Sequence, residues 1–250
     1  MFDVIAFDAD DTLWHNETLY ARAQDRFRAL WLADHDAARI DQTLYQTEMR
    51  NLGQYGYGIK GFALSMIEAA LELTQGRVTG QEVQHILDIA KDMLNAEVEL
   101  VEHAQPTLAA LAASHALMLI TKGDLVDQER KLTRSDLAPH FRYIEIVSAK
   151  TPAAYQAILT KYRIAPPRFL MVGNSIKSDV LPVLALGGRA VYIPYHLTWA
   201  HEAVVEPGSA EPGYYRLEHL GQLPALVERI SLPDPDQTSQ LRLKPAVAAG

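Results

Sequence analysis

Two carboxylic acids, Asp8 and Asp10, follow the apolar run Val4–Phe7 near the start of the chain. The run is typical of a short buried strand, because polar residues bound it too closely for a helix. Such a strand places both acids at the carboxyl edge of a sheet, where ligands bind in open α/β folds. There, one acid can act as a nucleophile and the other can carry a proton. The alternative is an Asp-rich turn that simply ends the strand.

Polar residues also end three later apolar runs. Thr121, Lys122 and Gly123 follow the first run, Lys150 follows the second, and a loop that closes with Asp179 follows the third. The helix expected after Gly123 would offer backbone N–H groups to an oxyanion. Because the carboxyl ends of parallel strands share one edge, these residues and the first two acids predict an anion site beside a metal site.

Strands and helices alternate over most of the chain after residue 100. We expect strands at 117–120, 143–147, 169–172 and 189–193, in addition to the first one. Helices are expected to begin at Pro106 and Leu125 and to span 151–162 and 178–186. This alternation predicts a Rossmann-like α/β fold, in which helices flank a parallel sheet.

The segment between the first two strands has helical periodicity and no convincing strand. Helices are expected at 17–34, 36–52 and 61–74, and a fourth begins at a capping box formed by Thr79 and Glu82. These helices predict a bundle inserted after the first strand. We therefore expect a core of residues 1–14 and 100–230, a helical cap of residues 15–99, and a disordered tail of residues 231–250.

The composition narrows the classes of partner. The chain has 250 residues, with 23 basic and 31 acidic side chains and a net charge of −8. It has no basic stripe, so we expect no nucleic acid partner. It has no cysteine, which excludes disulfides and thiolate chemistry and suits the cytoplasm. The N-terminus has no secretory signal pattern, and no apolar run is long enough for a membrane span. The sequence leaves the oligomeric state open.

Taken in order, these motifs resemble those of the haloacid dehalogenase-like (HAD) hydrolase superfamily over about residues 3–230. Each motif alone is weak, but all of them occur in order and each follows an apolar run. They are Asp8-x-Asp10-x-Thr12, Thr121, Lys150 and the loop that ends in Asp179.

The resemblance implies a mechanism through an aspartyl-phosphate. Asp8 would attack phosphorus, and Asp10 would protonate the departing alkoxide and then take a proton from the hydrolytic water. The groups that would bind the phosphoryl oxygens are the Thr121 hydroxyl, the N–H groups of Lys122 and Gly123, and the Lys150 ammonium.

The resemblance also implies Mg²⁺ as cofactor. The ion would be held by the Asp8 carboxylate, the Asp10 backbone carbonyl and the Asp179 carboxylate. Asn174 stands where many relatives have Asp. Its carbonyl oxygen can face the metal or a bound water but adds no negative charge. We therefore expect weaker magnesium binding, not its loss.

The implied activity is magnesium-dependent hydrolysis of a small phosphorylated metabolite, with the helical cap selecting the leaving group. A phosphomutase on the same scaffold would differ mainly in protecting the aspartyl-phosphate from water. A dehalogenase would need neither the acid at Asp10 nor a metal. A phospho-ligand-binding protein with little catalysis is the non-enzyme alternative.

The segment from Gly56 to Gly61 fits the pattern G-x-G-x-x-G, yet no strand precedes it. We interpret it as a pliable loop between cap helices and not as a dinucleotide site. In relatives with this kind of cap, the loop faces the active site. Tyr55, Tyr57 and Lys60 are therefore candidate substrate contacts, although a tight turn with surface aromatics explains them equally well.

Overall fold

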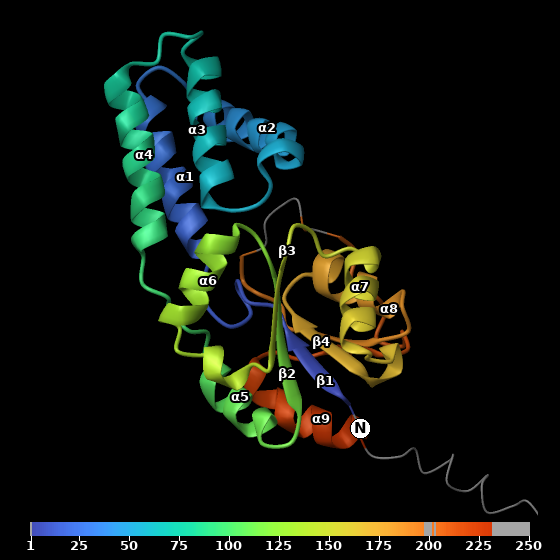
Figure 1. The fold of residues 1–250 in the computed structure, drawn as a ribbon. Helices are drawn as coiled ribbons and strands as arrows, with labels where there is room; N and C mark the ends of the chain where they lie inside the picture. The colour runs from blue at the N-terminus through green and yellow to red at the C-terminus, as the bar shows by residue number, and fades with distance from the viewer. Residues whose placement is uncertain (1, 198–201, 203, 232–250) are drawn as a thin grey trace, which may run out of the picture.

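The computed structural model describes residues 2–197, 202 and 204–231. Within these residues, the central sheet has six strands, all parallel, in the spatial order β3-β2-β1-β4-β5-β6 (Figure 1). The strands are β1 (Val4–Phe7), β2 (Ala116–Lys122), β3 (Tyr143–Val147), β4 (Phe169–Gly173), β5 (Arg189–Tyr192) and β6 (Tyr214–Arg216). The predicted parallel α/β fold is confirmed.

Side chains alternate across the sheet and create two apolar faces. Ile5 and Phe7 pack on one face with α5, α6 and α9, whereas Val4 and Ala6 pack on the other with α7 and α8. Figure 1 shows α5 and α9 together on one side of the sheet, and α7 and α8 on the other. These helices are α5 (Ala104–Ala112), α6 (Leu125–Arg134), α7 (Pro152–Tyr162), α8 (Leu181–Leu184) and α9 (Leu223–Ser231).

The strand order reverses beside β1, which lies between β2 and β4. The chain builds outward from β1 through β2 to β3, and then on the opposite side from β4 through β5 to β6. Ligands in open α/β sheets bind at the carboxyl ends of the strands next to such a reversal. Phe7 pairs with Leu119 and Val172, so Asp8 and Gly173 leave the sheet side by side.

Four helices between β1 and β2 form a helical unit with an apolar core of its own. Phe27, Trp31, Ile40, Met66 and Ile86 are almost fully buried within it. Figure 1 shows the unit standing beyond one end of the sheet. The helices are α1 (Glu17–Trp31), α2 (Ala37–Tyr55), α3 (Ile59–Leu73) and α4 (Gly80–Asn95). All four predicted helices are present, but the placement of domain boundaries around them stays a prediction.

Several predicted boundaries were wrong. Helix α5 begins at Ala104, ahead of Pro106, because any residue of a first turn can lack an N–H without losing an intrahelical bond. The helix predicted at 178–186 begins instead with a π-helical turn, η3 (Ile176–Val180), and α8 ends at Leu184.

Two elements near the end of the described chain were not predicted. Strand β6 is only three residues long, and α9 extends to Ser231. The disordered tail was predicted to begin at residue 231, but Ser231 belongs to α9. Residues 232–250 lie outside the described part of the chain.

Among the described helices, none combines the length and the apolar character that a membrane crossing requires.

The capping box predicted for the fourth helix is confirmed. Thr79 Oγ1 accepts from the Glu82 amide at 3.2 Å, and the Thr79 amide donates to Glu82 Oε2 at 2.7 Å. We expect Thr79→Ala to lower the free energy of unfolding by about 1 kcal/mol, because the first turn of α4 loses an N–H partner. Urea denaturation would measure this loss. Thr43→Ala, which removes an exposed hydroxyl in the middle of α2, is the control. An equal loss in both variants would contradict the capping role.

Candidate active site

A cavity lies between the carboxyl edge of the sheet and the helical unit, and both contribute side chains to its lining. Every residue predicted for the sheet side of the site lines this cavity: Asp8, Asp10, Thr121, Lys122, Gly123, Lys150, Asn174 and Asp179. The fold thus gathers residues that follow four different strands.

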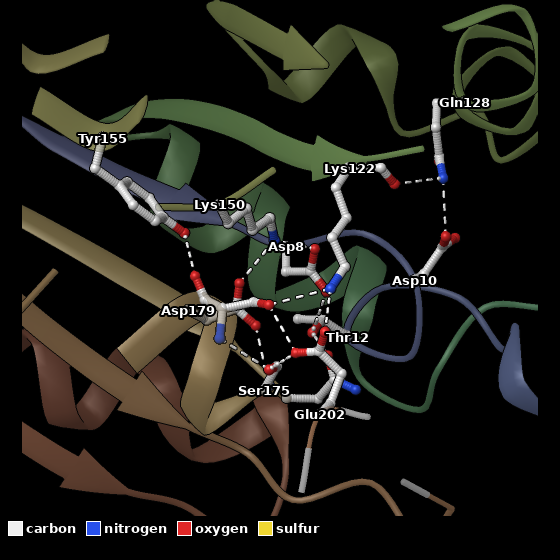
Figure 2. Close-up of polar contacts among 12 residues, drawn as sticks. Asp8, Asp10, Thr12, Lys122, Gln128, Lys150, Tyr155, Ser175, Asp179 and Glu202 are labelled. Carbon is white, nitrogen blue, oxygen red and sulfur yellow. Dashed lines mark hydrogen bonds and ion pairs between the residues drawn. The ribbon is translucent and has the colours of Figure 1, made fainter. Parts of the chain in front are cut away.

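The Lys150 ammonium joins two buried carboxylates (Figure 2). It contacts Asp8 Oδ1, and it donates to Asp179 Oδ1 at 2.7 Å. The second oxygen of Asp179 accepts from the backbone amide of Ser175 at 3.0 Å. A side chain at Gly173 would collide with this arrangement, because its Cβ would lie 2.2 Å from Asp179 Oδ2. Glycine is therefore required where β4 ends.

Burial raises the pKa of Asp8 above its ordinary value, and the neighbouring carboxylate of Asp179 adds to the shift. Lys150 opposes it by attracting the ionised form. Burial disfavours the charged form of Lys150 as well, but Asp179 and Asp8 outweigh this and raise the pKa of the ammonium. The nucleophilic form of Asp8 thus depends on nearby positive charge.

Asp10 lies in a different environment from Asp8. Its carboxylate accepts from Trp14 Nε1 at 2.7 Å, from Gln128 Nε2 at 2.8 Å and from Lys131 Nζ at 3.0 Å. Burial would raise the pKa of Asp10, but Lys131, Gln128 and Trp14 together lower it. Figure 2 shows Asp10 turned toward Gln128 and away from the ion cluster around Lys150. Two acids of one loop therefore have opposite pKa shifts.

The end of β2 offers anion-binding groups. Thr121 is 1% exposed and is followed by Lys122 and Gly123, which has a φ of +141°. A Cβ at Gly123 would lie 3.0 Å from Gln128 Nε2, so glycine lets the backbone and α6 approach each other. The Lys122 ammonium lies 4.5 Å from the ring centroid of Tyr57, which comes from the helical unit.

Glu202 was not predicted, yet its carboxylate enters this site (Figure 2). It accepts from Lys122 Nζ at 2.5 Å, from Ser175 Oγ at 2.5 Å and from Ser178 Oγ at 2.7 Å. Burial opposes ionisation of Glu202, but Lys122 and the two hydroxyls lower its pKa to about 2. The edge of the sheet therefore binds a further carboxylate besides those of Asp8, Asp10 and Asp179.

The oxygen atoms at the base of the cavity fit a magnesium ion. The Asn174 amide nitrogen donates to Asp8 Oδ2 at 3.1 Å and to the Asp10 carbonyl at 3.3 Å. These two oxygens therefore point at the same position. A cation at this position would be attracted to them in the same way as the N–H group of Asn174. With the carboxylate of Asp179 nearby, the donors are all oxygens, as Mg²⁺ prefers. No cluster of three or more acidic, His or Cys side chains suited to a metal occurs among the described residues.

The comparisons with known proteins agree with this arrangement. The sequence model for haloacid dehalogenase-like hydrolases matches residues 2–187. The chain belongs to the haloacid dehalogenase-like (HAD) hydrolase family. A family hydrolase from Xanthomonas campestris is 39% identical, with a TM-score of 0.82, and the match covers 92% of this chain and 91% of that one. No curated protein matches the chain.

Two more distant structures share the fold of this HAD hydrolase. A haloacid dehalogenase from Pseudomonas syringae is 21% identical, with a TM-score of 0.62, over 92% of this chain and 100% of that one. A HAD hydrolase from Bacillus subtilis with bound magnesium is 14% identical, with a TM-score of 0.65, over 91% of this chain and 99% of that one. At these identities the likeness concerns the fold alone.

The three candidates from the helical unit have different positions in this HAD hydrolase. Tyr55 and Tyr57 line the cavity, and the Tyr55 hydroxyl donates to Glu68 at 2.9 Å. Lys60 does not line it, because its ammonium pairs with Asp124 at 2.9 Å, at the N-terminus of α6. The structure thus pairs Lys60 with Asp124, a residue outside the helical unit. The sequence did not indicate this contact.

Gln128 and Lys131 of α6 were also missed. The helix turns a polar face inward: Asp127 and Gln128 are 5% and 3% exposed, whereas Leu125 and Val126 are 55% and 53% exposed. A search for apolar stripes therefore emphasises the solvent side of this helix. The one feature of the sequence that could have indicated Gln128 and Lys131 is a polar stripe along α6. Such a stripe is usually the solvent-exposed face of a helix.

We expect Lys150→Met to lower the free energy of unfolding by about 3–5 kcal/mol, because Asp8 and Asp179 would be left as uncompensated buried charges. The loss should be larger at about pH 8 than at about pH 5. Since the folded-state pKa of Asp8 is raised, the penalty grows as the pH rises and decreases once the Asp8 carboxyl group is protonated. Urea denaturation at both pH values is the measurement. Lys91→Met, which breaks an exposed pair with Asp88, should have little effect. Equal losses in both variants would contradict the assignment.

Proposed function

We propose that this HAD hydrolase is a magnesium-dependent phosphomonoesterase that acts on a small phosphorylated metabolite through an aspartyl-phosphate on Asp8. Three features of the cavity support the proposal. A carboxylate nucleophile lies beside a lysine, a second acid stands two residues away, and hydroxyl and backbone N–H groups line the end of β2.

In the first half of the reaction, Asp8 attacks phosphorus, and the bond from phosphorus to the ester oxygen breaks. Asp10, which must first take up a proton although Lys131 and Gln128 favour its ionised form, gives this proton to that oxygen, so the leaving group departs as an alcohol. Thr121, the amides that follow it and Lys150 would stabilise the charge on the phosphoryl oxygens.

In the second half, a water molecule attacks phosphorus and releases Asp8 and inorganic phosphate. Asp10 accepts the proton of this water and thereby regains the proton that it donated in the first half. The hydrogen bonds from Lys131 and Gln128 support this step, because they hold Asp10 in the ionised form that accepts a proton. The acid and base roles of Asp10 therefore balance over one turnover.

Asp8, the Asp10 carbonyl and Asp179 would hold Mg²⁺, together with Asn174 once its amide turns so that the carbonyl oxygen, and not the NH₂ group, faces the ion. When bound there, the ion would supply positive charge that favours ionised Asp8 and reduces its repulsion from the phosphate dianion. The raised pKa of Asp8 in the protein alone is consistent with a need for such charge.

The observation that carries the proposal is the network that holds Asp10 in the cavity. An alkoxide leaving group must be protonated, whereas a halide leaves as a stable anion and needs no acid. A dehalogenase would therefore have no chemical use for Asp10 or for the residues that hold it.

The role of the helical unit as a cap is part of the same proposal. Tyr57 and Tyr20 of this unit line the cavity and would contact the leaving group.

Release of inorganic phosphate from para-nitrophenyl phosphate tests the proposal. We expect magnesium-dependent turnover that Asp8→Asn lowers by more than about a thousandfold. Asp10→Asn should accumulate phosphorylated protein, seen by mass spectrometry, because an aryl leaving group needs little protonation whereas attack by water needs the base. Asp92→Asn, at an exposed ion pair with Arg26, is the matched control and should keep the activity.

The competing reactions have distinct signatures. Halide release from chloropropionate without phosphate release would replace the proposal with a dehalogenase. Transfer of the phosphoryl group to an added sugar phosphate in preference to water would indicate a phosphomutase. Phosphate release that persists in Asp8→Asn would exclude the mechanism.

A further prediction concerns Asn174. We expect Asn174→Asp to lower the magnesium concentration for half-maximal activity by about tenfold, because one more negative charge would lie beside the metal site. A magnesium titration of phosphate release is the measurement. Asn95→Asp, an exposed substitution at the end of α4, should leave the titration unchanged. If Asn174→Asp also leaves it unchanged, Asn174 does not lie at the metal.

A further inference from the structure

The helical unit brings into the cavity two carboxylates that have no partner among the described residues. Glu17 begins α1 and Glu48 lies in α2, and both line the cavity that contains Asp8. Glu48 is 9% exposed. Within the described part of the chain, neither carboxylate makes a hydrogen bond or an ion pair.

The other acids of the cavity differ in this respect. Asp10 pairs with Lys131, and Asp11 accepts from the backbone amides of Asn16 and Glu17. A buried carboxylate without such partners is costly, and a hydrophobic residue of similar size would be more stable. Retaining Glu48 therefore calls for a partner that the described chain does not supply.

The surroundings of these acids suit a cation. The rings of Tyr20 and Phe62 line the same part of the cavity, with centroids 5.1 Å apart. Aromatic faces attract ammonium groups, and so do carboxylates. The Tyr20 hydroxyl has no hydrogen-bond partner among the described residues and is free to accept from a ligand. Asn51 and Gln24 add neutral polar groups to the lining.

Electrostatics agree with this interpretation. Burial, together with the charge of Glu17, raises the pKa of Glu48 to about 8. Burial, together with Asp11 and Asp10, raises the pKa of Glu17 to about 7. Both carboxylates are therefore poorly compensated in the protein alone, and a bound cation would stabilise their ionised forms.

We propose that Glu17 and Glu48 bind a protonated amino group on the leaving group of the substrate, so that the enzyme prefers phosphate monoesters of amino alcohols. The inference rests on the proposed phosphatase function. The phosphate would lie against Thr121 and Lys150 at the sheet, and the amine would lie between the two acids and the aromatic rings of the helical unit. A neutral hydroxyl could bond to these acids but would not stabilise their ionised forms.

Matched substrates test the proposal. Aminoethyl and aminopropyl phosphate would be compared with hydroxyethyl and hydroxypropyl phosphate, by phosphate release with magnesium present. We expect kcat/KM to favour the amine of each pair by at least about tenfold, the worth of one charged hydrogen bond. In Glu48→Gln and in Glu17→Gln, this ratio should fall toward one. Because both substrates of a pair are measured with the same variant, a general loss of activity in that variant does not change the ratio of the two kcat/KM values. Glu72→Gln, at an exposed ion pair with Arg50 in the same helical unit, should keep it.

A binding measurement separates this inference from the proposed function. Calorimetry with propylammonium and Asp8→Asn protein requires no turnover, and binding should weaken when Glu48→Gln is added. Hydrolysis of the hydroxyalkyl phosphates without preference for the amines would overturn the inference and leave the phosphatase intact. Absence of hydrolysis for every phosphate ester, with amine binding retained, would overturn the phosphatase and leave the amine site.

Discussion

The site depends on one buried ammonium, that of Lys150, placed between the carboxylates of Asp8 and Asp179. These acids follow β1 and β4, neighbouring strands of the sheet, and would repel each other without a cation between them. Their approach also requires that Gly173 carry no side chain. The parallel sheet, the order of its strands and the glycine at the end of β4 are all conditions for this contact. The reactivity proposed for Asp8 depends on this contact.

The two walls of the cavity differ in how their carboxylates are compensated. Lysines come from the sheet side, where Lys122, Lys131 and Lys150 each meet a carboxylate. The helical unit contributes Glu17 and Glu48, whose carboxylates have no partner among the described residues. The proposed phosphate site and the proposed amine site therefore lie on opposite walls of one cavity. This division links the proposed chemistry at Asp8 with the proposed choice of leaving group.

The predictable part of the site consists of residues at the carboxyl end of a strand or in the loop that follows it. Thr121, Lys150 and Asp179 could be found because an apolar run before each of them marks the strand end. Lys131 could not, because it lies in a helix whose buried face includes polar side chains, which apolar periodicity does not identify. Glu202 follows no buried strand, and its pairing with Lys122 depends on how distant segments pack. The same holds for Lys60, which contacts Asp124 across the cavity's edge.

By itself, the sequence determined which segments form strands and helices and which polar residues follow the strands, because these depend on neighbours a few positions away. The capping box at Thr79 and Glu82 is of this kind. The tertiary structure alone decided the partners: Lys150 lies between two acids, Lys131 pairs with Asp10, and Glu48 has no partner among the described residues. Burial and charge pairing are properties of groups brought together from distant segments. They therefore set the pKa values and the ligand preference only once the chain has folded.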